Sequence, residues 1–568
     1  MRRIPSTQAS THLEDLVDVL MEALGRGELQ LDLLTTPAPP GLKAPGWPEA
    51  HRQALVASGW LEGEHSPMLL EGDQLSWRRW QISMDAVVKA LLDRSTEQLI
   101  NAKGQVVSPP GTASSGTLSP RTTSARTAAA QTAAAQTAVK DLNAEQQAAV
   151  KAINHQGVIL ISGGPGTGKT STVLQMLVQA LSINPELRIG LAAPTGKAAR
   201  RLQDAVQSGL RNTTTSHRER IGKVPCNTLH RWLKAKPNGF GVDAQEPLRL
   251  DLLVVDEMSM VDLALMHALI QALPKKCQLV LVGDPAQLPP VGSGAIWHRL
   301  QKDDIRHKFG SSAIHLQQTY RNNGALASMN ATLRQHGLNA FWKDLDQLSV
   351  DQNLIHHRCR SNRLPEILVE NLQRQLKQLR QLSLTWMEKE CIEESSDELE
   401  TYADLMVTIL DQLMVLCPRR RGLWSVMDVH RSILGRQLDS GVNQWPMGLP
   451  VICGENQAEI GVANGDIGLI MGEGDSRRLL FRAMSAQGER LARLLHPARL
   501  RTIAPALAIT IHKAQGSEAD KVILLWPEMT ERKTVQSPLE AVGSYESRLL
   551  YTAITRAKHH LDLITPAV

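Results

Sequence analysis

The chain has 568 residues, too many for a single hydrophobic core, and this length predicts about three to five domains. A net charge of +5, from 62 basic and 57 acidic residues, permits nucleic-acid binding without indicating it, so local patches have to decide. The charged start has no apolar targeting segment, and nowhere do about 18 uncharged apolar residues follow one another. This excludes a membrane-spanning protein and predicts a soluble intracellular one.

The six cysteines are scattered along the chain and form no C-x-x-C pair. A zinc site or a disulfide framework needs closer spacing of its ligands or partners. The pattern therefore favours reduced, mostly buried thiols.

Residues 1–103 are expected to form a helical N-terminal domain, because Leu13, Leu16 and Leu20 recur at helical spacing. The apolar face of this helix fits either the core of a small domain or a docking surface for a partner, and the sequence leaves both open. Residues 104–140 follow as a linker, a low-complexity stretch of Ser, Thr, Pro, Ala and Gln. Its apolar surface is too small to offset the entropy of the chain.

Beyond the linker, short apolar runs end in glycine or in an acidic residue, and helix-like segments separate them. One set is "GVILISGG", "LRIGLAAP", "LDLLVVDE" and "QLVLVGD", and a second set is "LAITIHKAQG", "KVILLWP" and "HLDLI". This rhythm is typical of parallel sheets that are buried on both faces, with chemistry at the carboxyl ends of the strands. We therefore predict an α/β fold with two domains, 141–320 and 321–568, the second partly interrupted within 360–500.

The segment "GGPGTGKT" fits the pattern G-x-x-x-x-G-K-[ST] and stands between the predicted strand "GVILIS" and a helix predicted to begin near Ser171. Glycines let backbone N–H groups approach phosphates, Lys169 supplies a point charge at the β and γ positions, and the Thr170 hydroxyl suits Mg²⁺. The predicted nucleotide-binding residues are Gly163, Gly164, Pro165, Gly166, Thr167, Gly168, Lys169, Thr170 and Ser171.

Two carboxylates follow the strand of "LLVVDEMSM". Asp256 is predicted to hold Mg²⁺ together with Thr170, and Glu257 to polarise the attacking water as a general base. Downstream of a phosphate-binding loop, this pair predicts hydrolysis and not binding alone. Gln287, in the loop after "LVGD", is a candidate sensor of the γ-phosphate, and Gln146, before the first strand, is a candidate reader of the adenine edge.

Nine segments resemble, in order, the motif series of superfamily 1 helicases: "LNAEQ", "GGPGTGKT", "LAAPTGKAARRL", "NTLHRWL", "VVDEMSMVD", "LVGDPAQLPPVGSGA", "QQTYR", "LAITIHKAQGSEAD" and "LLYTAITRAKHHL". The set is most similar to the 5′-to-3′ branch that contains RecD, the alpha subunit of exodeoxyribonuclease V. The resemblance implies ATP and Mg²⁺ as cofactors and two RecA-like P-loop NTPase domains. It also implies a small insertion at about 234–250, which splits duplex at the fork, and a β-rich insertion at about 440–500.

The same resemblance implies two arginine fingers from the second domain, Arg321 of "QQTYR" and Arg556 of "AITRAK". Cationic donors on another domain reach the transferring phosphoryl group only when the cleft closes, which couples hydrolysis to domain movement. The residues that the resemblance implies for DNA binding are Thr195, Gly196, Lys197, His230 and Arg231 on the first domain and Thr510, His512 and Lys513 on the second. Their donors suit phosphates, so we expect sequence-tolerant and salt-sensitive binding.

The implied function is that of a motor subunit in recombinational repair, which moves 5′-to-3′ on single-stranded DNA and unwinds duplex DNA ends. Its implied partners are a RecB-like beta subunit, which carries the nuclease centre, and a RecC-like gamma subunit, on which the N-terminal domain docks. The expected location is the bacterial cytoplasm, with no membrane partner. Two alternatives stay open: a stand-alone 5′-to-3′ helicase, and a nucleotide-gated DNA-binding scaffold subunit without unwinding.

Overall fold

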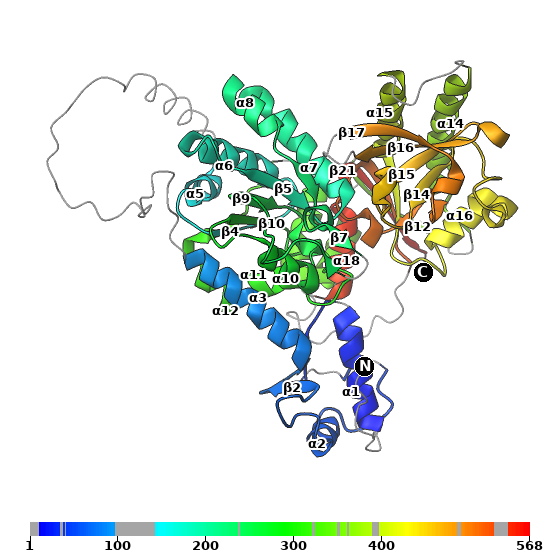
Figure 1. The fold of residues 1–568 in the computed structure, drawn as a ribbon. Helices are drawn as coiled ribbons and strands as arrows, with labels where there is room; N and C mark the ends of the chain where they lie inside the picture. The colour runs from blue at the N-terminus through cyan, green and yellow to red at the C-terminus, as the bar shows by residue number, and fades with distance from the viewer. Residues whose placement is uncertain are drawn as a thin grey trace, which may run out of the picture.

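The computed structural model describes residues 11–25, 27–34, 38–39, 41–96, 142–236, 239–320, 324–348, 353–360, 363–388, 397–484, 490–527 and 544–567. The predicted linker 104–140 and the predicted finger Arg321 lie outside these ranges. We call residues 11–96 the N-terminal region, 142–320 the first lobe and 324–567 the second lobe. Figure 1 shows the two lobes side by side, with the start of the chain below them.

The first lobe is built on a six-stranded sheet in the order β11-β4-β10-β9-β5-β6, in which every strand pair is parallel. Its strands are β4 (Val158–Gly163), β5 (Ile189–Ala193), β6 (Cys226–Thr228), β9 (Leu252–Val255), β10 (Gln278–Gly283) and β11 (Ala313–Leu316). Its helices are α5 (Ala144–Ala152), α6 (Lys169–Ile183), α7 (Gly196–Gly209), α8 (Thr215–Gly222), α9 (Leu229–Trp232), α10 (Leu263–Ala272), α11 (Ile296–Gln301) and α12 (Asp303–Arg306).

Strand β4 explains why these apolar runs form a sheet covered on both faces. Val158 and Leu160 belong to the core on one side, whereas Ile159 and Ile161 belong to the core on the other side. Side chains alternate across a strand, so an unbroken Val/Ile/Leu run satisfies both faces at once. Figure 1 shows α5, α6, α7 and α8 on one side of the sheet and α10, α11 and α12 on the other. The carboxyl ends of the parallel strands therefore open onto one edge, where the motifs lie.

The second lobe has its own parallel sheet, in the order β12-β21-β20-β13-β19. Its strands are β12 (Leu354–Cys359), β13 (Leu413–Cys417), β19 (Ile509–Thr510), β20 (Ala519–Leu525) and β21 (Ala557–Pro566). Its helices are α13 (Ala325–Gln347), α14 (Glu366–Met387), α15 (Asp397–Gln412), α16 (Val426–Leu434) and α18 (Tyr545–Ile554). The two parallel sheets flanked by helices confirm the predicted α/β class.

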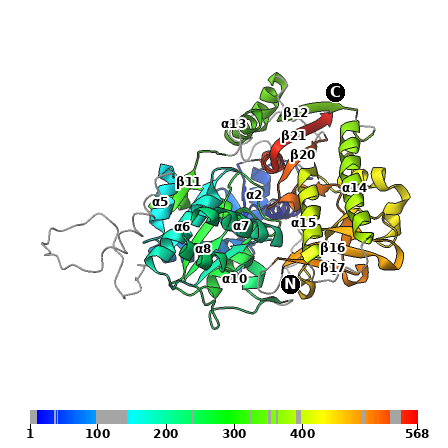
Figure 2. The ribbon, with the colours of Figure 1, turned by 90° about the horizontal axis from the view of Figure 1, so that it is seen from above.

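Two smaller sheets interrupt the lobes. A five-stranded antiparallel sheet, here called the β insertion, runs in the order β17-β16-β15-β14-β18 within the second lobe, and Figure 2 shows α14 and α15 beside it. Its strands are β14 (Pro450–Cys453), β15 (Ile467–Met471), β16 (Arg478–Met484), β17 (Arg490–Leu495) and β18 (Ile503–Pro505). In the first lobe, β7 (Ala235–Lys236) and β8 (Gly239–Phe240) pair antiparallel and form a short hairpin.

The N-terminal region contains the predicted helix α1 (Thr11–Gly25), followed by α2 (Glu49–Ala57) and α3 (Arg78–Thr96). It also contains a three-stranded antiparallel sheet that the sequence analysis did not anticipate, β1-β3-β2. The strands are β1 (Gln30–Asp32), β2 (Met68–Glu71) and β3 (Gln74–Trp77), each only three or four residues long. Such short strands give too few alternations to be distinguished from loops. Leu16, Leu20 and Leu55 lie in a core of their own beside this sheet.

Helix α3 belongs to the first lobe by its packing. Val87, Val88 and Leu91 are buried in the same core as Val158 and Leu160 of β4, and α3 lies along α10. At its end, the Arg94 guanidinium donates to the carbonyls of Pro274, Lys275 and Cys277 at 2.7, 3.0 and 2.7 Å. These bonds satisfy carbonyls that follow the last turn of α10.

Among the described residues, no helix combines the length and the apolar character that crossing a bilayer demands. The five described cysteines are free thiols, and four of them are buried, as the scattered spacing predicts. Cys391 lies outside the described ranges.

Candidate active site between the two lobes

The phosphate-binding loop joins β4 to α6. Helix α6 begins at Lys169, two residues before the predicted start, so that the N–H groups of its first turn face the loop without partners inside the helix. Gly166 and Gly168 have φ values of 72° and 80°, a left-handed conformation that glycine adopts without a steric cost. Lys169 Nζ donates to the carbonyls of Gly163 and Gly164, both at 2.8 Å, which holds the ammonium group across the mouth of the loop.

The acidic pair stands at the end of β9, on the same edge of the sheet, with β10 between β9 and β4. Asp256 Oδ1 accepts a hydrogen bond from Glu257 N–H at 2.8 Å, and Glu257 has the left-handed φ of 53° that a non-glycine residue rarely adopts. Burial, reinforced by the neighbouring Glu257 charge, raises the pKa of Asp256 to about 6, although Lys169 and Arg201 oppose this. Two carboxylates and the Thr170 hydroxyl at one cavity form a set of hard oxygen donors, which fits Mg²⁺.

A cavity of about 610 Å³ lies between the lobes and brings most of the predicted catalytic groups together. The predicted residues that line it are Pro165, Gly166, Gly168, Lys169, Thr170, Ser171, Asp256, Glu257, Gln287 and Arg556. Gln287 is 4% exposed, and its Oε1 atom is buried without a hydrogen-bond partner among the described residues. A buried amide that lacks a partner is costly, so its place in the cavity favours a polar ligand or a water molecule there.

Arg556 reaches the cavity from the second lobe. Its guanidinium is 2% exposed and donates to the Thr552 carbonyl at 2.9 Å, the Ser517 carbonyl at 3.2 Å and Thr555 Oγ1 at 3.0 Å. Burial lowers the pKa of Arg556, and the charges of Glu257 and Glu518 act against that shift. A cation from one lobe thus faces the phosphate-binding loop of the other.

Two further side chains, those of Gln146 and Tyr320, lie beside the phosphate-binding loop. Gln146 forms a capping box with Asn143, and its Nε2 atom would be 2.6 Å from a Cβ atom added at Gly168. Tyr320 was missed in the sequence analysis. Its N–H donates to the Gly166 carbonyl at 2.8 Å, its hydroxyl accepts from Asn143 Nδ2 at 3.1 Å, and its side chain is 55% exposed. An exposed aromatic ring beside the nucleotide loop offers a stacking face for a purine.

Three hydrogen bonds tie the Gln287 loop to the second lobe. The Tyr551 hydroxyl donates to Asp284 Oδ2 at 3.0 Å, the Leu288 N–H donates to Thr552 Oγ1 at 2.9 Å, and Gln515 Nε2 donates to the Leu288 carbonyl at 3.3 Å. The candidate γ-phosphate sensor therefore sits in a loop that contacts both lobes.

The predicted strand-binding residues of the first lobe surround the start of α7 and the short helix α9. Thr195 caps α7, with Oγ1 accepting from Ala198 N–H at 3.2 Å, and Gly196 packs against Ala463 of the β insertion. Lys197 lines a separate cavity of about 200 Å³ together with Asp411, and burial lowers the pKa of Lys197 to about 8.

His230 and Arg231 lie on α9 beside the β7–β8 hairpin, with the His230 ring 6.5 Å from that of Phe240. Burial lowers the pKa values of both His230 and Arg231.

On the second lobe, Thr510 and His512 line a third cavity, of about 310 Å³, together with Pro289, Pro290 and Tyr545. His512 Nε2 and the Tyr545 hydroxyl are hydrogen-bonded at 2.8 Å. Lys513 is the next residue along the chain, and burial lowers its pKa. Of these predicted strand contacts, Lys197 lines one cavity, and Thr510 and His512 line another. The role of all of them in strand binding stays a prediction.

Two protein families match parts of the chain. Residues 146–293 match a family described as an AAA domain, and residues 505–564 match the UvrD-like helicase C-terminal domain. The first match covers the phosphate-binding loop, the acidic pair and Gln287, and the second covers the stretch from Thr510 to Arg556.

Whole-chain comparison finds curated relatives called RecBCD enzyme subunit RecD. The protein from Mycolicibacterium smegmatis is 32% identical over 441 residues, which cover 74% of this chain and 70% of the relative. The protein from Haemophilus influenzae is 28% identical over 468 residues, covering 74% and 68%. A helicase of Deinococcus radiodurans called ATP-dependent RecD2 DNA helicase is 28% identical over 431 residues, but this match covers only 48% of its length.

Among solved structures, a Pif1 helicase at forked double-stranded DNA overlaps 75% of this chain and 92% of its own, with 17% identity and a TM-score of 0.39. A superposition of that quality carries no functional inference.

Proposed function

The chain belongs to the RecD family, and from that premise we propose that it is an ATP-dependent 5′-to-3′ DNA helicase, the motor subunit of a RecBCD-type exodeoxyribonuclease V. One observation carries the proposal: a single cavity between the lobes contains Lys169 and the acidic pair of the first lobe and Arg556 of the second. Groups from both lobes at one phosphate site mean that hydrolysis and relative lobe position depend on each other.

In the proposed reaction, the phosphate-binding loop and Lys169 hold the β- and γ-phosphates of ATP while Gln146 and Tyr320 contact the base. Glu257 accepts the proton of the attacking water, and the proton remains on its carboxylate until the product leaves. Asp256 and Thr170 are the residues that would hold Mg²⁺. When bound, that ion neutralises negative charge on the phosphate oxygens. The Gln287 amide orients the water or the γ-phosphate.

Arg556 stabilises the charge that spreads over the transferring phosphoryl group. Such an arginine contributes on the order of 10³–10⁵ in rate. In the structure its three donor nitrogens are held by oxygens of the second lobe, so it is preorganised at the cavity wall. Arg321 is proposed as a second finger, on the family resemblance alone.

Each hydrolysis cycle is proposed to shift one lobe against the other, and the strand would follow because its contacts are divided between the lobes. Thr195, Gly196 and Lys197 would hold it on the first lobe, and Thr510, His512 and Lys513 on the second. Phosphate-directed contacts of this kind fix position without reading sequence. The β7–β8 hairpin, with His230 and Arg231 beside it, would meet the duplex at the fork.

The proposed setting is a heterotrimer with a RecB-like and a RecC-like subunit that acts on double-strand DNA ends in the bacterial cytoplasm. Nuclease activity would arise only through that complex. The N-terminal region is proposed to dock on the RecC-like partner.

The test is unwinding of forked DNA by the full chain, alone and with co-purified partners, using forks that carry only a 5′ or only a 3′ single-stranded tail. The proposal expects ATP-dependent strand displacement from the 5′-tailed fork and none with Lys169→Ala. Full activity of the isolated chain would favour the stand-alone helicase. DNA-stimulated ATP turnover without displacement in either setting would leave only the nucleotide-gated scaffold.

A further inference from the structure

The two segments that are proposed to hold the strand contact each other directly at the boundary between the lobes. Gly516, with a φ of 70°, lies against the first turn of α7: a Cβ atom added there would be 3.2 Å from Ala198 Cβ and 3.6 Å from Thr195 Oγ1. A side chain at this position would require Ala198 to shift by a few tenths of an ångström, and the left-handed φ would add backbone strain. The backbone that follows Thr510 and His512 is therefore packed against α7, the helix that Thr195 caps.

An ion pair crosses the same boundary two residues further along. Arg201 Nη2, on α7, lies 2.7 Å from Glu518 Oε2, on the second lobe. The side chains are 36% and 12% exposed. Both residues line the nucleotide cavity together with Lys169, Glu257 and Arg556. Sequence analysis passed over this pair because its members stand in different motifs, far apart along the chain.

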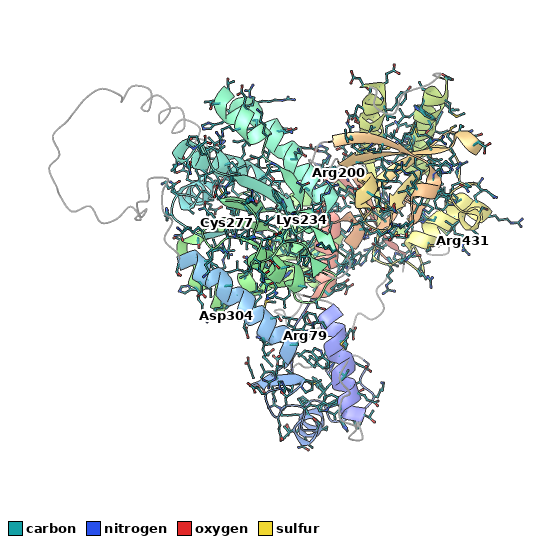
Figure 3. The ribbon with its side chains drawn as sticks, viewed as in Figure 1. Arg79, Arg200, Lys234, Cys277, Asp304 and Arg431 are labelled. Carbon is teal, nitrogen blue, oxygen red and sulfur yellow. The ribbon has the colours of Figure 1, made fainter. Side chains whose placement is uncertain are left out.

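A neighbouring residue of α7 makes a second contact with the other lobe. Arg200, which Figure 3 labels at the boundary between the lobes, pairs with Asp466 of the β insertion and donates to the Arg482 carbonyl. These residues do not line the nucleotide cavity. Consecutive arginines of one helix thus make two cross-lobe contacts, and only the contact of Arg201 is exposed to the charge of a nucleotide.

The charges around Arg201 make its pairing sensitive to what enters the cavity. Burial works against the charged form, yet the pKa of Arg201 is raised, because Glu518 and, to a smaller extent, Glu257 and Asp256 favour the cation. A triphosphate would bring several negative oxygens to the same cavity. These oxygens would compete with Glu518 for the guanidinium, while the Glu518 carboxylate would be repelled by them.

We propose that Arg201 and Glu518 form a nucleotide-responsive joint between the lobes. Their pairing sets the position of the Thr195 segment relative to the Thr510–Glu518 segment. The joint thereby couples the phosphate state of the nucleotide to the affinity for the strand. The inference rests on the proposed function and adds to it two positioning residues. In the nucleotide-free cleft the pair joins the two segments. With a triphosphate bound, the joint is loosened and the segments are free to change their spacing along the strand.

An ordinary surface ion pair is the competing interpretation, because exposed pairs contribute little. The first lobe offers a matched control for it. Arg220 and Glu186 form an ion pair at 3.1 Å with side chains 41% and 85% exposed, away from the cavity. If the Arg201–Glu518 pair contributed only to stability, breaking it and breaking the Arg220–Glu186 pair would change the nucleotide dependence of strand affinity equally little.

The experiment measures the affinity of the full chain for a fluorescent oligothymidine without nucleotide, with saturating ADP and with a saturating non-hydrolysable ATP analogue. Coupling between two sites commonly changes an affinity by about 5–150-fold, so the wild type should show a change within that range between nucleotide states. Arg201→Ala and Glu518→Gln should bring the ratio between states to within about twofold of one, far below that range. Arg220→Ala and Glu186→Gln should keep the wild-type ratio.

A charge-swapped variant, Arg201→Glu with Glu518→Arg, should recover part of the ratio, which a merely structural role would not predict. Glu518→Gln keeps the shape of the side chain and carries the test if Arg201→Ala does not fold. Wild-type ratios in both Arg201→Ala and Glu518→Gln would overturn the joint while leaving the helicase proposal intact. A wild-type chain that binds no strand in any nucleotide state would overturn the proposed function and the joint together.

Discussion

The nucleotide site and the strand-binding residues are organised in contrasting ways. Ten of the predicted nucleotide-binding and catalytic residues, Lys169 and Arg556 among them, line one cavity of about 610 Å³. The strand-binding positions are divided among separate cavities and helix ends on both lobes. Phosphoryl transfer needs several charges at one point, whereas a grip on a phosphate backbone is the sum of many small contacts. The contrast predicts large effects of single substitutions at the first site and small ones at the second.

The largest effect is expected for Lys169→Ala. Removing the cation that spans the loop mouth should abolish ATP turnover, a loss of at least about 10³-fold, while strand binding stays measurable. Steady-state ATP hydrolysis and fluorescence anisotropy with a labelled strand measure the two properties. Lys151→Ala, at an exposed position of α5, is the control. Unwinding by Lys169→Ala would mean that the ATP-hydrolysis site has been assigned to the wrong residues.

Arg556→Ala should slow hydrolysis by about 10³–10⁵-fold and change ATP affinity much less, because the guanidinium acts mainly on charge that develops in the transition state. Single-turnover hydrolysis and equilibrium binding of a fluorescent ATP analogue separate these effects. Comparable losses in rate and in affinity would reduce Arg556 to a binding residue.

Tyr320→Ala should weaken ATP binding about 5–10-fold through the loss of roughly 1–1.5 kcal/mol of aromatic stacking, with little change in maximal turnover. Tyr320→Phe retains the ring and should bind ATP nearly as the wild type does. The measurement is the KM for ATP alongside kcat. An unchanged KM in the alanine variant would remove Tyr320 from the base pocket.

The smallest effect concerns pH and Lys197. Burial lowers the pKa of Lys197 to about 8, so its charge is present at lower pH and is lost as pH rises through that value. Strand affinity should therefore fall between about pH 7 and 9 by a further two- to fivefold in the wild type relative to Lys197→Arg, which stays charged. If strand affinity changed with pH in the same way in both proteins, Lys197 would not be a strand contact.

The sequence predicted those features whose residues lie in one short stretch of the chain, and it missed features built from distant stretches. Lys169 and Asp256 each stand in a short motif whose chemistry can be read locally, whereas the role of Arg556 came from the family resemblance. The apolar run of β4 predicted a two-sided sheet. The pairing of Arg201 with Glu518 joins two motifs and needs the relative position of the lobes, which no local pattern contains. The strands β1, β2 and β3 are too short to show periodicity, and the packing of α3 on β4 follows from surface shape.

The seating of α3 in the first lobe means that the end of the N-terminal region shares the core of that lobe, although the predicted linker 104–140 separates the two in sequence. Burying an aliphatic side chain such as Val88 or Leu91 contributes roughly 1.5–3 kcal/mol, and Arg94 adds its bonds to three carbonyls. A protease cut within the linker should therefore leave two fragments that elute together. Deletion of residues 1–96 should instead expose the apolar surface that α3 covers on the first lobe, and the remaining chain should aggregate. We therefore expect the packing of α3, and not the covalent connection through residues 104–140, to hold the two parts together.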